Sequence, residues 1–491
     1  MIKYQSTRGS ADKKTAAQAV IKGIAEDKGL YVPDSIPALP ETVKQMTGRA
    51  YKDIAYSIIK AFFTDYTEDE MKACVNGAYD SKFESSEIVP ITKAGDAYFL
   101  ELYHGKTAAF KDMALSILPY LLTTAMKKEN EDKKICILTA TSGDTGKAAL
   151  EGFADVPGTE IIVFFPDHGV SQVQERQMIT QEGANTHVFA IKGNFDDAQT
   201  GVKKIFNDAA FEKDLAEAGC KLSSANSINI GRLVPQVAYY VYGYVKLVER
   251  GIISDGDKIN IVVPTGNFGN ILAAYYASRM GIPVNRFICA SNENKVLTDF
   301  FNTGVYDTNR EFYLTNSPSM DILISSNLER LLYHLSGNDG DEIKILMSRL
   351  ETDRHYEVSS AIRNGMKDFY GGFADVADTN ETIGRMYREN GYLIDTHTAV
   401  AYKVYENYVA ETGDKTPSLI ASTASPYKFA DSVALSIGLK EEKSGFDYIK
   451  AVEAETGVKV PGCLRDLDKK PVRHGQVIDT DNMPEAVKNS L

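Results

Sequence analysis

Lys111 is the residue of this sequence whose type and setting most directly suggest chemistry. Gly105 and Thr107 predict a turn ahead of a helix, so Lys111 would lie in the first turns of that helix, with Phe110 and Met113 beside it. Burial there would disfavour the charged form of the amine, lower its pKa and make it nucleophilic. Schiff-base chemistry requires such an amine. A lysine on a solvated helix face is the commoner arrangement. This segment alone therefore does not show whether Lys111 is a reactive amine.

A loop rich in hydroxyl groups follows one of the apolar runs and leads into a helix. Its members are Thr141, Ser142, Gly143, Asp144 and Thr145. Free backbone N–H groups at the start of a helix, together with these hydroxyls, form a site for a carboxylate or a phosphate. A capped turn without a ligand is the alternative.

The same loop differs from a nucleotide-binding P-loop. Only two residues separate Gly143 from Gly146, and Ala148 follows Lys147 in place of a serine or threonine. The P-loop needs four intervening residues and a hydroxyl for magnesium. We therefore reject that interpretation.

A second glycine loop also joins an apolar run to a helix, and it comprises Gly266, Asn267, Phe268, Gly269 and Asn270. Two glycines separated by two residues allow the backbone to approach a phosphate closely. The spacing is not G-x-G-x-x-G, so it does not indicate a dinucleotide site. A plain tight turn remains the alternative.

Thr423 follows another apolar run, just before a predicted helix start at Ser425 and Pro426. Serine fits the N-cap position and proline the first helical position. This arrangement accounts for both residues and leaves the Thr423 hydroxyl free at the edge of the sheet. Judged by spacing alone, a structural role for Thr423 is the more frequent outcome.

A further polar segment contains Asn226, Ser227, Asn229 and Arg232. If the segment is helical, Asn226, Asn229 and Arg232 line one side of the helix. The forked donors of Arg232 suit a phosphate, although a polar helix start would have the same composition. His104 and His397 are isolated histidines. An isolated histidine more often packs or forms hydrogen bonds than takes part in catalysis.

The elements that must position these residues alternate between short apolar runs and helical stretches. The predicted strands are Ile135–Leu138, Ile161–Phe165, His187–Ile191, Ile259–Val263, Phe287–Ala290 and Ser418–Ala421. This alternation predicts an α/β fold with mostly parallel sheets, in which ligands bind beyond the carboxyl ends of the strands. The residues before about position 93 are predicted to be mainly helical, with helices at Thr15–Lys28 and Tyr51–Phe63 and a helix start at Thr67.

Composition narrows the class of protein. With 491 residues, 43% hydrophobic and 25% charged, the chain can form several globular lobes. Its net charge of −13 disfavours nucleic acid as a partner. The five cysteines are scattered, which argues against a disulfide framework or a zinc site. We find no secretory signal and no run approaching the roughly 18 apolar residues of a membrane span, so we expect a cytoplasmic protein with no metal.

Taken in order, these segments resemble fold-type-II pyridoxal-phosphate (PLP) enzymes of the tryptophan-synthase-β type, and in particular the threonine synthases. The lysine segment is similar to the family's His-Gly-Pro-Thr-x-Ala-Phe-Lys-Asp, with Lys106 at the proline position. The segments Tyr4–Gly9, Gly29–Pro33, Asp321–Arg330 and Asp395–Val400 extend the resemblance towards both ends of the chain. This coverage distinguishes threonine synthases from other fold-type-II enzymes.

The resemblance implies two open, mostly parallel α/β lobes with the cofactor between them and a helical N-terminal region. We expect an N-terminal domain at residues 1–93 and a catalytic region at 94–491, with a smaller lobe at roughly 130–230. Lys111 would hold pyridoxal 5'-phosphate, the loop Gly266–Asn270 its phosphate, and Thr423 its ring nitrogen.

The implied reaction converts O-phospho-L-homoserine and water to L-threonine and phosphate, by γ-elimination followed by addition of water at Cβ. Thr141–Thr145 would bind the substrate carboxylate. Asn226, Ser227, Asn229 and Arg232 are candidates for its phosphate. Lys111 is the group expected to move the protons.

Alternatives remain at this stage. Another fold-type-II lyase, such as a threonine or serine dehydratase or a phospholyase, would use the same lysine and phosphate loop. A protein that binds PLP or phosphate without turnover is the non-enzymatic alternative. The implied partner is a small molecule, with neither nucleic acid nor membrane, and the protein is expected to be a monomer or a homodimer.

Overall fold

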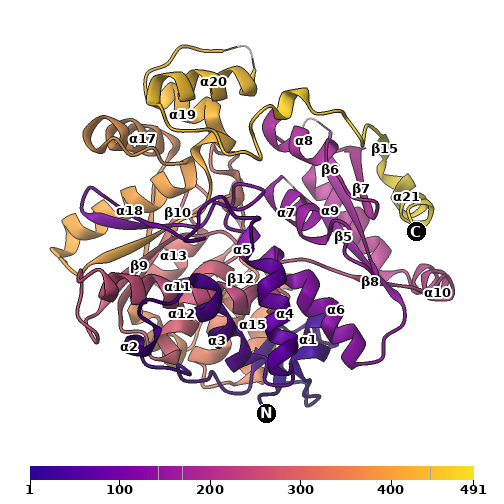
Figure 1. Cartoon of the computed structure of the whole chain (residues 1–491). Coiled ribbons are helices and arrows are strands. Elements are labelled where there is room, and N and C mark those ends of the chain that lie inside the picture. Colours follow the sequence, from indigo (N-terminus) through magenta and orange to yellow (C-terminus); the bar gives the residue numbers. More distant parts are fainter. Residues whose placement is uncertain (142, 168–169, 443) are drawn as a thin grey trace.

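Two open sheets dominate the computed structural model, which describes residues 1–141, 143–167, 170–442 and 444–491. The larger sheet has the strand order β13-β10-β9-β14-β4-β3, and the smaller one the order β15-β7-β6-β5-β8. All neighbouring strands are parallel except the β3–β4 pair. Figure 1 shows the two sheets on opposite sides of the molecule, with the short helix α5 (Asp112–Leu115) and helix α7 (Asp144–Phe153) between them.

The strands of the larger sheet are β3 (Ile91–Ala94), β4 (Ala97–Glu101), β9 (Ile259–Pro264), β10 (Val284–Ser291), β13 (Phe369–Phe373) and β14 (Ser418–Ser422). Those of the smaller sheet are β5 (Lys134–Ala140), β6 (Thr159–Pro166), β7 (Thr186–Lys192), β8 (Cys220–Ser223) and β15 (Val477–Asp479). All six apolar runs predicted as strands lie in β5, β6, β7, β9, β10 and β14. These strands are almost fully buried, as expected for parallel strands covered on both faces.

Helices cover both faces of each sheet. Around the smaller sheet they are α6 (Leu118–Lys128), α7, α8 (Gln172–Ile179), α9 (Phe195–Asn207), α10 (Ala209–Glu217) and α21 (Met483–Asn489). Around the larger sheet they are α11 (Ile230–Glu249), α12 (Gly269–Met280), α13 (Val296–Thr303), α14 (Leu328–Leu335), α15 (Gly340–Thr352), α16 (Ser360–Gly365), α17 (Val376–Asn390), α18 (Thr396–Thr412), α19 (Ala430–Ser436) and α20 (Gly445–Thr456). A small antiparallel pair of strands, β11 (Val305–Asp307) and β12 (His355–Glu357), lies beside the larger sheet.

The N-terminal residues form mainly helices, as predicted: α1 (Ala16–Lys22), α2 (Val43–Met46), α3 (Tyr51–Phe62) and α4 (Glu68–Ala78), with a short pair of strands, β1 (Tyr4–Ser6) and β2 (Tyr31–Pro33). Thr67 caps α4 in a reciprocal bond with Glu70. Helix α1 ends at Lys22 and not at Lys28, because Gly23 adopts φ 71° and turns the chain. The domain boundary at residue 93 stays a prediction.

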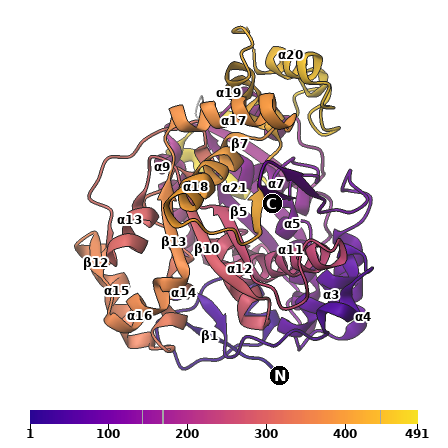
Figure 2. The ribbon, with the colours of Figure 1, turned by 90° about the vertical axis from the view of Figure 1, so that its left-hand side faces the viewer.

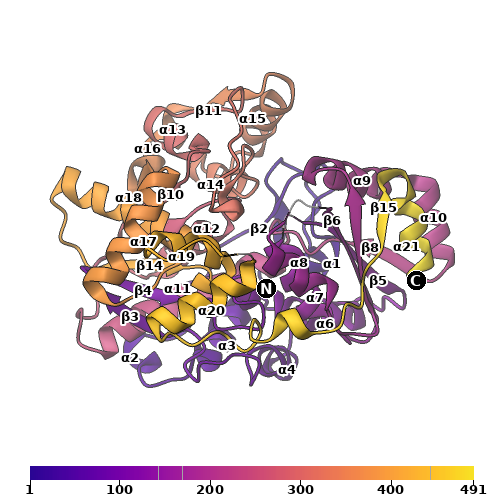
Figure 3. The same ribbon diagram turned by 90° about the horizontal axis from the view of Figure 1, so that it is seen from above.

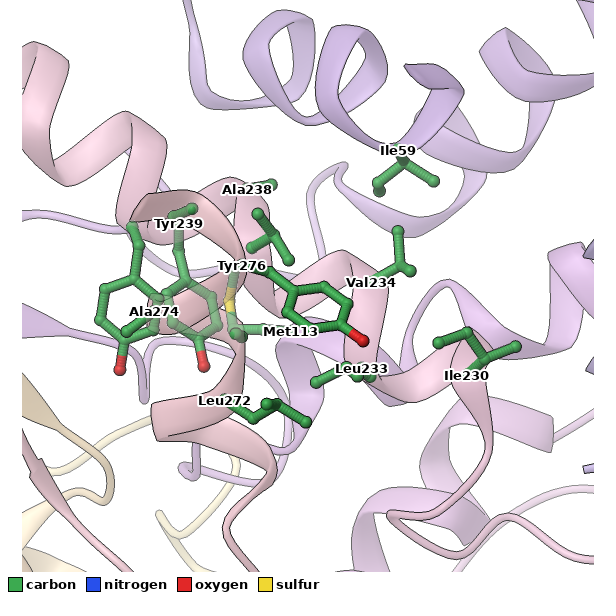
Figure 4. Close-up of a cluster of buried hydrophobic side chains, with 14 of the residues drawn as sticks. Ile59, Met113, Ile230, Leu233, Val234, Ala238, Tyr239, Leu272, Ala274 and Tyr276 are labelled. Carbon is green, nitrogen blue, oxygen red and sulfur yellow. The ribbon is translucent and has the colours of Figure 1, made fainter. Parts of the chain in front are cut away.

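One helix joins the N-terminal region to the larger lobe. Helix α11 is buried along nearly its whole length and packs against α3 and α12. Figure 4 shows the side chains at this junction, with Ile59 of α3, Val234 and Tyr239 of α11, and Met113 in one cluster. Because Met113 is fully buried only two residues after Lys111, this core fixes the backbone that carries the lysine.

The C-terminal segment connects the two lobes. After α20 the chain crosses to the smaller sheet, where β15 pairs with β7 and α21 packs on α9 (Figures 2 and 3). Arg176 of α8 holds the crossing segment through the carbonyl groups of Leu467, Asp468 and Lys470. The range expected for the smaller lobe, 130–230, contains its other four strands but not β15.

Within the described residues, no helix combines the length and the hydropathy needed to cross a bilayer. The same residues contain no group of three or more His, Cys, Asp or Glu side chains arranged to hold a metal ion. All five cysteines are free thiols.

Candidate active site

Lys111 is the N-cap residue of helix α5, the short helix that lies between the two sheets in Figure 1. The backbone before it is tied to the end of strand β14: Ala109 bridges to Ala424, and the Phe110 N–H donates to the Thr423 carbonyl at 2.8 Å. The backbone after it is fixed by Tyr79, whose hydroxyl donates to the Met113 carbonyl at 2.6 Å. The structure therefore brings Lys111 and Thr423 together, from positions more than 300 residues apart in the sequence.

The amine of Lys111 is largely withdrawn from water, with 12% of the side chain exposed. Its Nζ lies 3.4 Å from Oγ of Ser319 and 3.7 Å from a carboxylate oxygen of Asp144. Burial lowers the pKa of Lys111 to about 8; Asp144 opposes this shift, whereas the cations Lys428 and Arg232 add to it. The predicted lowering of the lysine pKa is thus confirmed.

Asp144 is the carboxylate at the centre of the site. It is 4% exposed and forms a 2.8 Å ion pair with Lys428, which is fully buried. Gln174 Nε2 donates to the same carboxylate oxygen at 2.9 Å, and Ser319 Oγ donates to the other at 3.3 Å. Burial alone would raise the pKa of Asp144, but the ammonium groups of Lys428 and Lys111 outweigh it and hold this pKa well below its usual range.

The loop before helix α7 is shaped for an anion by its backbone. Thr141 Oγ1 accepts hydrogen bonds from the Gly143 and Gly146 N–H groups at 3.0 and 2.9 Å. Gly143 adopts φ 136°, and a Cβ there would lie 2.6 Å from Gln174, so glycine is required. The N-cap residue, Gly143, has no side chain, and among the described residues the N–H groups of Asp144 and Thr145 have no acceptor, which leaves them to an outside acceptor. Ser142 of this predicted site lies outside the described residues.

The loop Gly266–Asn270 has the features of a phosphate cradle. Phe268 is in the left-handed conformation (φ 64°) and precedes α12, which no side chain caps, so consecutive N–H groups face outward at the helix start. A Cβ on Gly266 would lie 2.5 Å from the Ser319 carbonyl. Only glycine therefore lets the Ser319 loop close over the cradle.

Asn270 adds a directed side chain to this cradle. The hydroxyls of Tyr239 and Tyr240 both donate to its Oδ1. Its Nδ2 is buried and, among the described residues, has no hydrogen-bond partner. A buried donor without an acceptor is costly, and a phosphate oxygen would satisfy it.

The segment Asn226–Arg232 is not one helix, so the condition under which Asn226, Asn229 and Arg232 would line one helix side is not met. Residues 226–229 form a turn, and α11 begins at Ile230. Asn229 caps α11 through Oδ1, and its Nδ2 donates to the Val20 carbonyl at 2.9 Å. Its amide is therefore engaged by the backbone, while Asn226 is exposed and Ser227 partly exposed on the turn.

Arg232 stands out in this segment because it is a buried cation without an anion. It is 3% exposed, Nη1 donates to the Ala225 carbonyl at 2.8 Å, and Nε has no partner among the described residues. Burial lowers the pKa of Arg232 to about 10, with no carboxylate to oppose the shift. A buried unpaired guanidinium is costly, and an anionic ligand would remove that cost.

Two residues of this site were missed by the sequence analysis, Ser319 and Lys428. Lys428 lies in a short 3-10 helix, Pro426–Phe429, that closely follows strand β14. Site residues were expected after each strand, so its place in the sequence was a usable signal. Ser319 comes from the irregular loop after β11 and carried no such signal.

Ser319 also gives His397 a place in the site. The Ser319 N–H donates to His397 Nε2 at 3.2 Å, and His397 Nδ1 lies 2.8 Å from Asp395. His397 therefore supports the loop that contacts Lys111. His104, by contrast, pairs with Glu101 at 2.8 Å, and Lys106, at the family's proline position, pairs with Glu151 at 3.3 Å.

The residues present fit a phosphorylated aldehyde cofactor of the PLP type. The fit rests on a buried amine with a lowered pKa, on the unsatisfied Asn270 Nδ2, and on an uncapped helix start with a left-handed residue before it. Thr423, which is 5% exposed, lies next to the lysine segment, because its carbonyl accepts a hydrogen bond from the Phe110 N–H.

Comparison with protein families covers almost the whole chain. Residues 3–79 match the family described as "Threonine synthase N terminus", residues 87–423 "Pyridoxal-phosphate dependent enzyme", and residues 398–490 "Threonine synthase, C-terminal". Threonine synthase of Saccharomyces cerevisiae is 35% identical over 461 residues, which cover 88% of each chain. The crystal structure of PLP-bound threonine synthase from Brucella melitensis superposes with a TM-score of 0.89 at 33% identity, covering 100% of this chain and 99% of the other.

Human "Threonine synthase-like 1" is 40% identical over 442 residues. The match covers 87% of this chain but 58% of that relative's length.

The lowered pKa of Lys111 predicts the pH dependence of cofactor attachment. Only the unprotonated amine attacks an aldehyde, so the rate at which PLP links to the cofactor-free protein should rise with pH through a midpoint near 8. Stopped-flow absorbance measures this rate. Nα-acetyl-lysine serves as the reference, and its rate of reaction with PLP should rise around the ordinary lysine pKa. If the protein and the reference had the same midpoint, the argument that burial lowers the pKa of Lys111 would be contradicted.

The unsatisfied amide of Asn270 predicts a weaker cofactor complex for Asn270→Asp. The substitution keeps the shape and the acceptor for both tyrosines but replaces the free donor with an anionic oxygen. Losing one hydrogen bond to a charged group costs about 1.5–3 kcal/mol, roughly 10- to 150-fold in Kd. Absorbance titration with PLP measures the change. The control Asn194→Asp, at the exposed cap of α9, should bind PLP normally, and equal affinities for both variants would remove Asn270 from the phosphate site.

Proposed function

Because the chain belongs to the threonine synthase family of pyridoxal-phosphate-dependent enzymes, we propose that it converts O-phospho-L-homoserine and water to L-threonine and phosphate. The observation that carries this proposal is the buried Lys111 amine, with its pKa near 8, beside a second buried cation, Arg232, that has no anion. The first provides an acid–base group tuned towards neutral pH. The second provides a site for a phosphorylated substrate.

The cofactor would be held by residues from both sides of the site. The uncapped start of α12 and the Asn270 amide support Gly266–Asn270 as the site of its phosphate. The neutral hydroxyl of Thr423 would form a hydrogen bond with the ring nitrogen of the cofactor. Unlike a carboxylate, a hydroxyl does not keep that nitrogen protonated. When bound, pyridoxal phosphate supplies an electron-withdrawing ring that acidifies the proton on the substrate's Cα.

The carboxylate and the phosphate of the substrate would bind at two separate places in the site. Its carboxylate would accept from the Asp144 and Thr145 N–H groups at the start of α7. The Asp144 side chain itself is engaged by Lys428 and Gln174, so we assign carboxylate binding to the backbone, with Thr141 and Gly143 shaping the loop.

The phosphate of the substrate would be received by Arg232 and the turn at Asn226 and Ser227. Asn327 supports this placement, because its Nδ2 lies 2.9 Å from the Asn267 carbonyl and 3.4 Å from Ser227 Oγ, which ties the turn to the cofactor-phosphate loop. Asn229 then fixes the start of α11, and its direct contact with substrate remains a prediction.

Lys111 would move the protons. Nζ would take the proton from Cα and release it before taking a second one from Cβ, since a neutral amine holds only one; phosphate then leaves Cγ with its bonding electron pair. A proton would return from Nζ to Cγ, water would add its hydroxyl at Cβ while its own proton goes to Nζ, and a last proton would return to Cα. Two protons leave the substrate and two return to it, and the proton of the added water ends on the released phosphate. Asp144 at 3.7 Å and Ser319 at 3.4 Å stabilise Nζ when it is charged. An amine with a pKa near 8 both accepts and returns protons near neutral pH.

The charges of the site favour a phosphorylated substrate over a neutral one. Lys111, Lys428 and Arg232 bring three cations to one buried carboxylate, Asp144. A dehydratase acting on threonine or serine needs to accommodate only the amino-acid carboxylate and the cofactor phosphate. The additional unpaired guanidinium is explained by a second phosphate.

We expect the PLP-loaded protein to release phosphate and threonine from O-phospho-L-homoserine in equal amounts. Phosphate assayed with amino-acid analysis measures both. Lys111→Ala should lose the cofactor's lysine-linked absorbance and all turnover, since no other group can replace the amine. Phosphate accompanied by a keto acid would identify a lyase relative, and neither product in the PLP-loaded protein would overturn the substrate.

Arg232→Gln should raise KM for O-phospho-L-homoserine by about tenfold or more, because a charge-assisted contact to phosphate is lost. Steady-state kinetics on the PLP-loaded variant test this expectation. The control is Arg363→Gln, which changes an exposed arginine that donates to the Thr303 carbonyl and should leave KM unaltered. An unchanged KM for the Arg232 variant would remove this residue from the phosphate site.

A further inference from the structure

We propose that Lys428 is a positioning residue for the reaction. Its buried ammonium is the permanent counter-ion of Asp144, so that the Lys111 amine can leave this carboxylate, bind the cofactor and exchange protons without stranding a buried charge. The inference rests on the proposed function of Lys111.

The contacts of Lys428 show a lysine held in place on several sides. Its side chain is 0% exposed, and Nζ lies 2.8 Å from Asp144 Oδ1, 2.9 Å from the Thr107 carbonyl and 3.3 Å from Gln177 Oε1. Asp144 and Gln177 belong to helices of the smaller lobe, whereas Thr107 lies in the loop that leads to Lys111. Lys428 itself follows strand β14 of the larger sheet. One ammonium group thus joins both lobes and the lysine loop.

The two lysines around Asp144 are not equivalent. Lys428 approaches the carboxylate to 2.8 Å, a hydrogen-bonded ion pair, whereas Lys111 stays at 3.7 Å. Asp144 is 4% exposed, and a buried carboxylate that loses its only counter-ion is strongly destabilised. Because Lys428 compensates Asp144 at all times, Lys111 can become neutral or covalently linked at no such cost.

The charges that face this pair come from several elements. Arg232 of α11 and Lys428 both act to lower the pKa of Lys111, and Asp144 of α7 acts to raise it. Asp112 of α5 and Cys463 of the C-terminal segment face Lys428, and burial raises the pKa of Asp112 to about 6 and that of Cys463 to about 12. Near neutral pH the thiol is therefore uncharged, and the charged carboxylate of Asp112 is held by the N–H and the hydroxyl of Thr107. Asp144 is the carboxylate that Lys428 Nζ contacts directly, at 2.8 Å.

The test is the pH titration of the lysine-linked cofactor absorbance in the intact PLP-loaded protein. The titrating nitrogen is Nζ of Lys111, so removing a neighbouring cation should raise the midpoint. For Lys428→Met we expect an upward shift of about one pH unit or more. The acidic limb of kcat/KM should move in the same direction, which lowers kcat/KM about tenfold on that limb. Lys428→Arg keeps the charge and should restore the wild-type midpoint.

A matched control separates this effect from the general loss of an ion pair. Lys128→Met removes a partly buried lysine that pairs with Glu70 at 3.0 Å between α6 and α4, and it should leave the titration unchanged. The absorbance readout requires bound cofactor but no turnover. A failure of the proposed reaction therefore does not affect it, and the two inferences fail separately.

A second comparison covers the case in which Lys428→Met does not fold. Asp144→Asn removes the carboxylate and should lower the midpoint, and Lys428→Met/Asp144→Asn, which leaves no stranded charge, should return it towards the wild-type value. The difference between these two variants isolates the effect of Lys428 on Lys111. An unshifted midpoint in folded Lys428→Met, or equal midpoints in this second pair, would overturn the proposal.

Discussion

The structure depends on keeping one amine buried, unprotonated for part of the time, and surrounded by sites for anions. A lysine in water stays charged at neutral pH, and a lysine locked to a single carboxylate stays charged as well. Lys111 avoids both outcomes because it is withdrawn from solvent and shares Asp144 with a closer lysine. Its pKa near 8 results from this balance of burial, one carboxylate and neighbouring cations.

The architecture serves this balance by bringing distant segments to one point. The carbonyl of Thr423 fixes the backbone before Lys111, and Met113 anchors the backbone after it in the core shared by α11, α12 and the N-terminal helices. Parallel sheets direct their glycine loops to the same edge. The irregular loop at Ser319 closes over one of these loops because Gly266 has no side chain to obstruct it.

The sequence predicted the parts of this arrangement that depend on local pattern. Apolar runs identified six of the parallel strands, because buried parallel strands are continuous in hydropathy, and glycine spacing marked the two loops that lead into α7 and α12. Short edge strands such as β3 and β15 escaped, since four and three residues are too few to show a hydropathy pattern. Lys428 and Ser319 escaped because their roles arise from tertiary contacts with Asp144. Whether Asn226–Asn229 was helix or turn stayed open, because polar residues three apart fit both conformations.

Strand β15 has a consequence for how the molecule is made. Strand β7, the edge of the smaller sheet until β15 pairs with it, lies nearly 300 residues before its partner in the sequence. During synthesis, N-terminal segments fold first, so the backbone N–H and C=O groups at the edge of β7 stay unpaired until β15 is made. An unpaired edge strand is a surface through which chains aggregate. The smaller sheet is completed only when the C-terminal segment has emerged. Its outer edge is therefore among the last parts of the molecule to form.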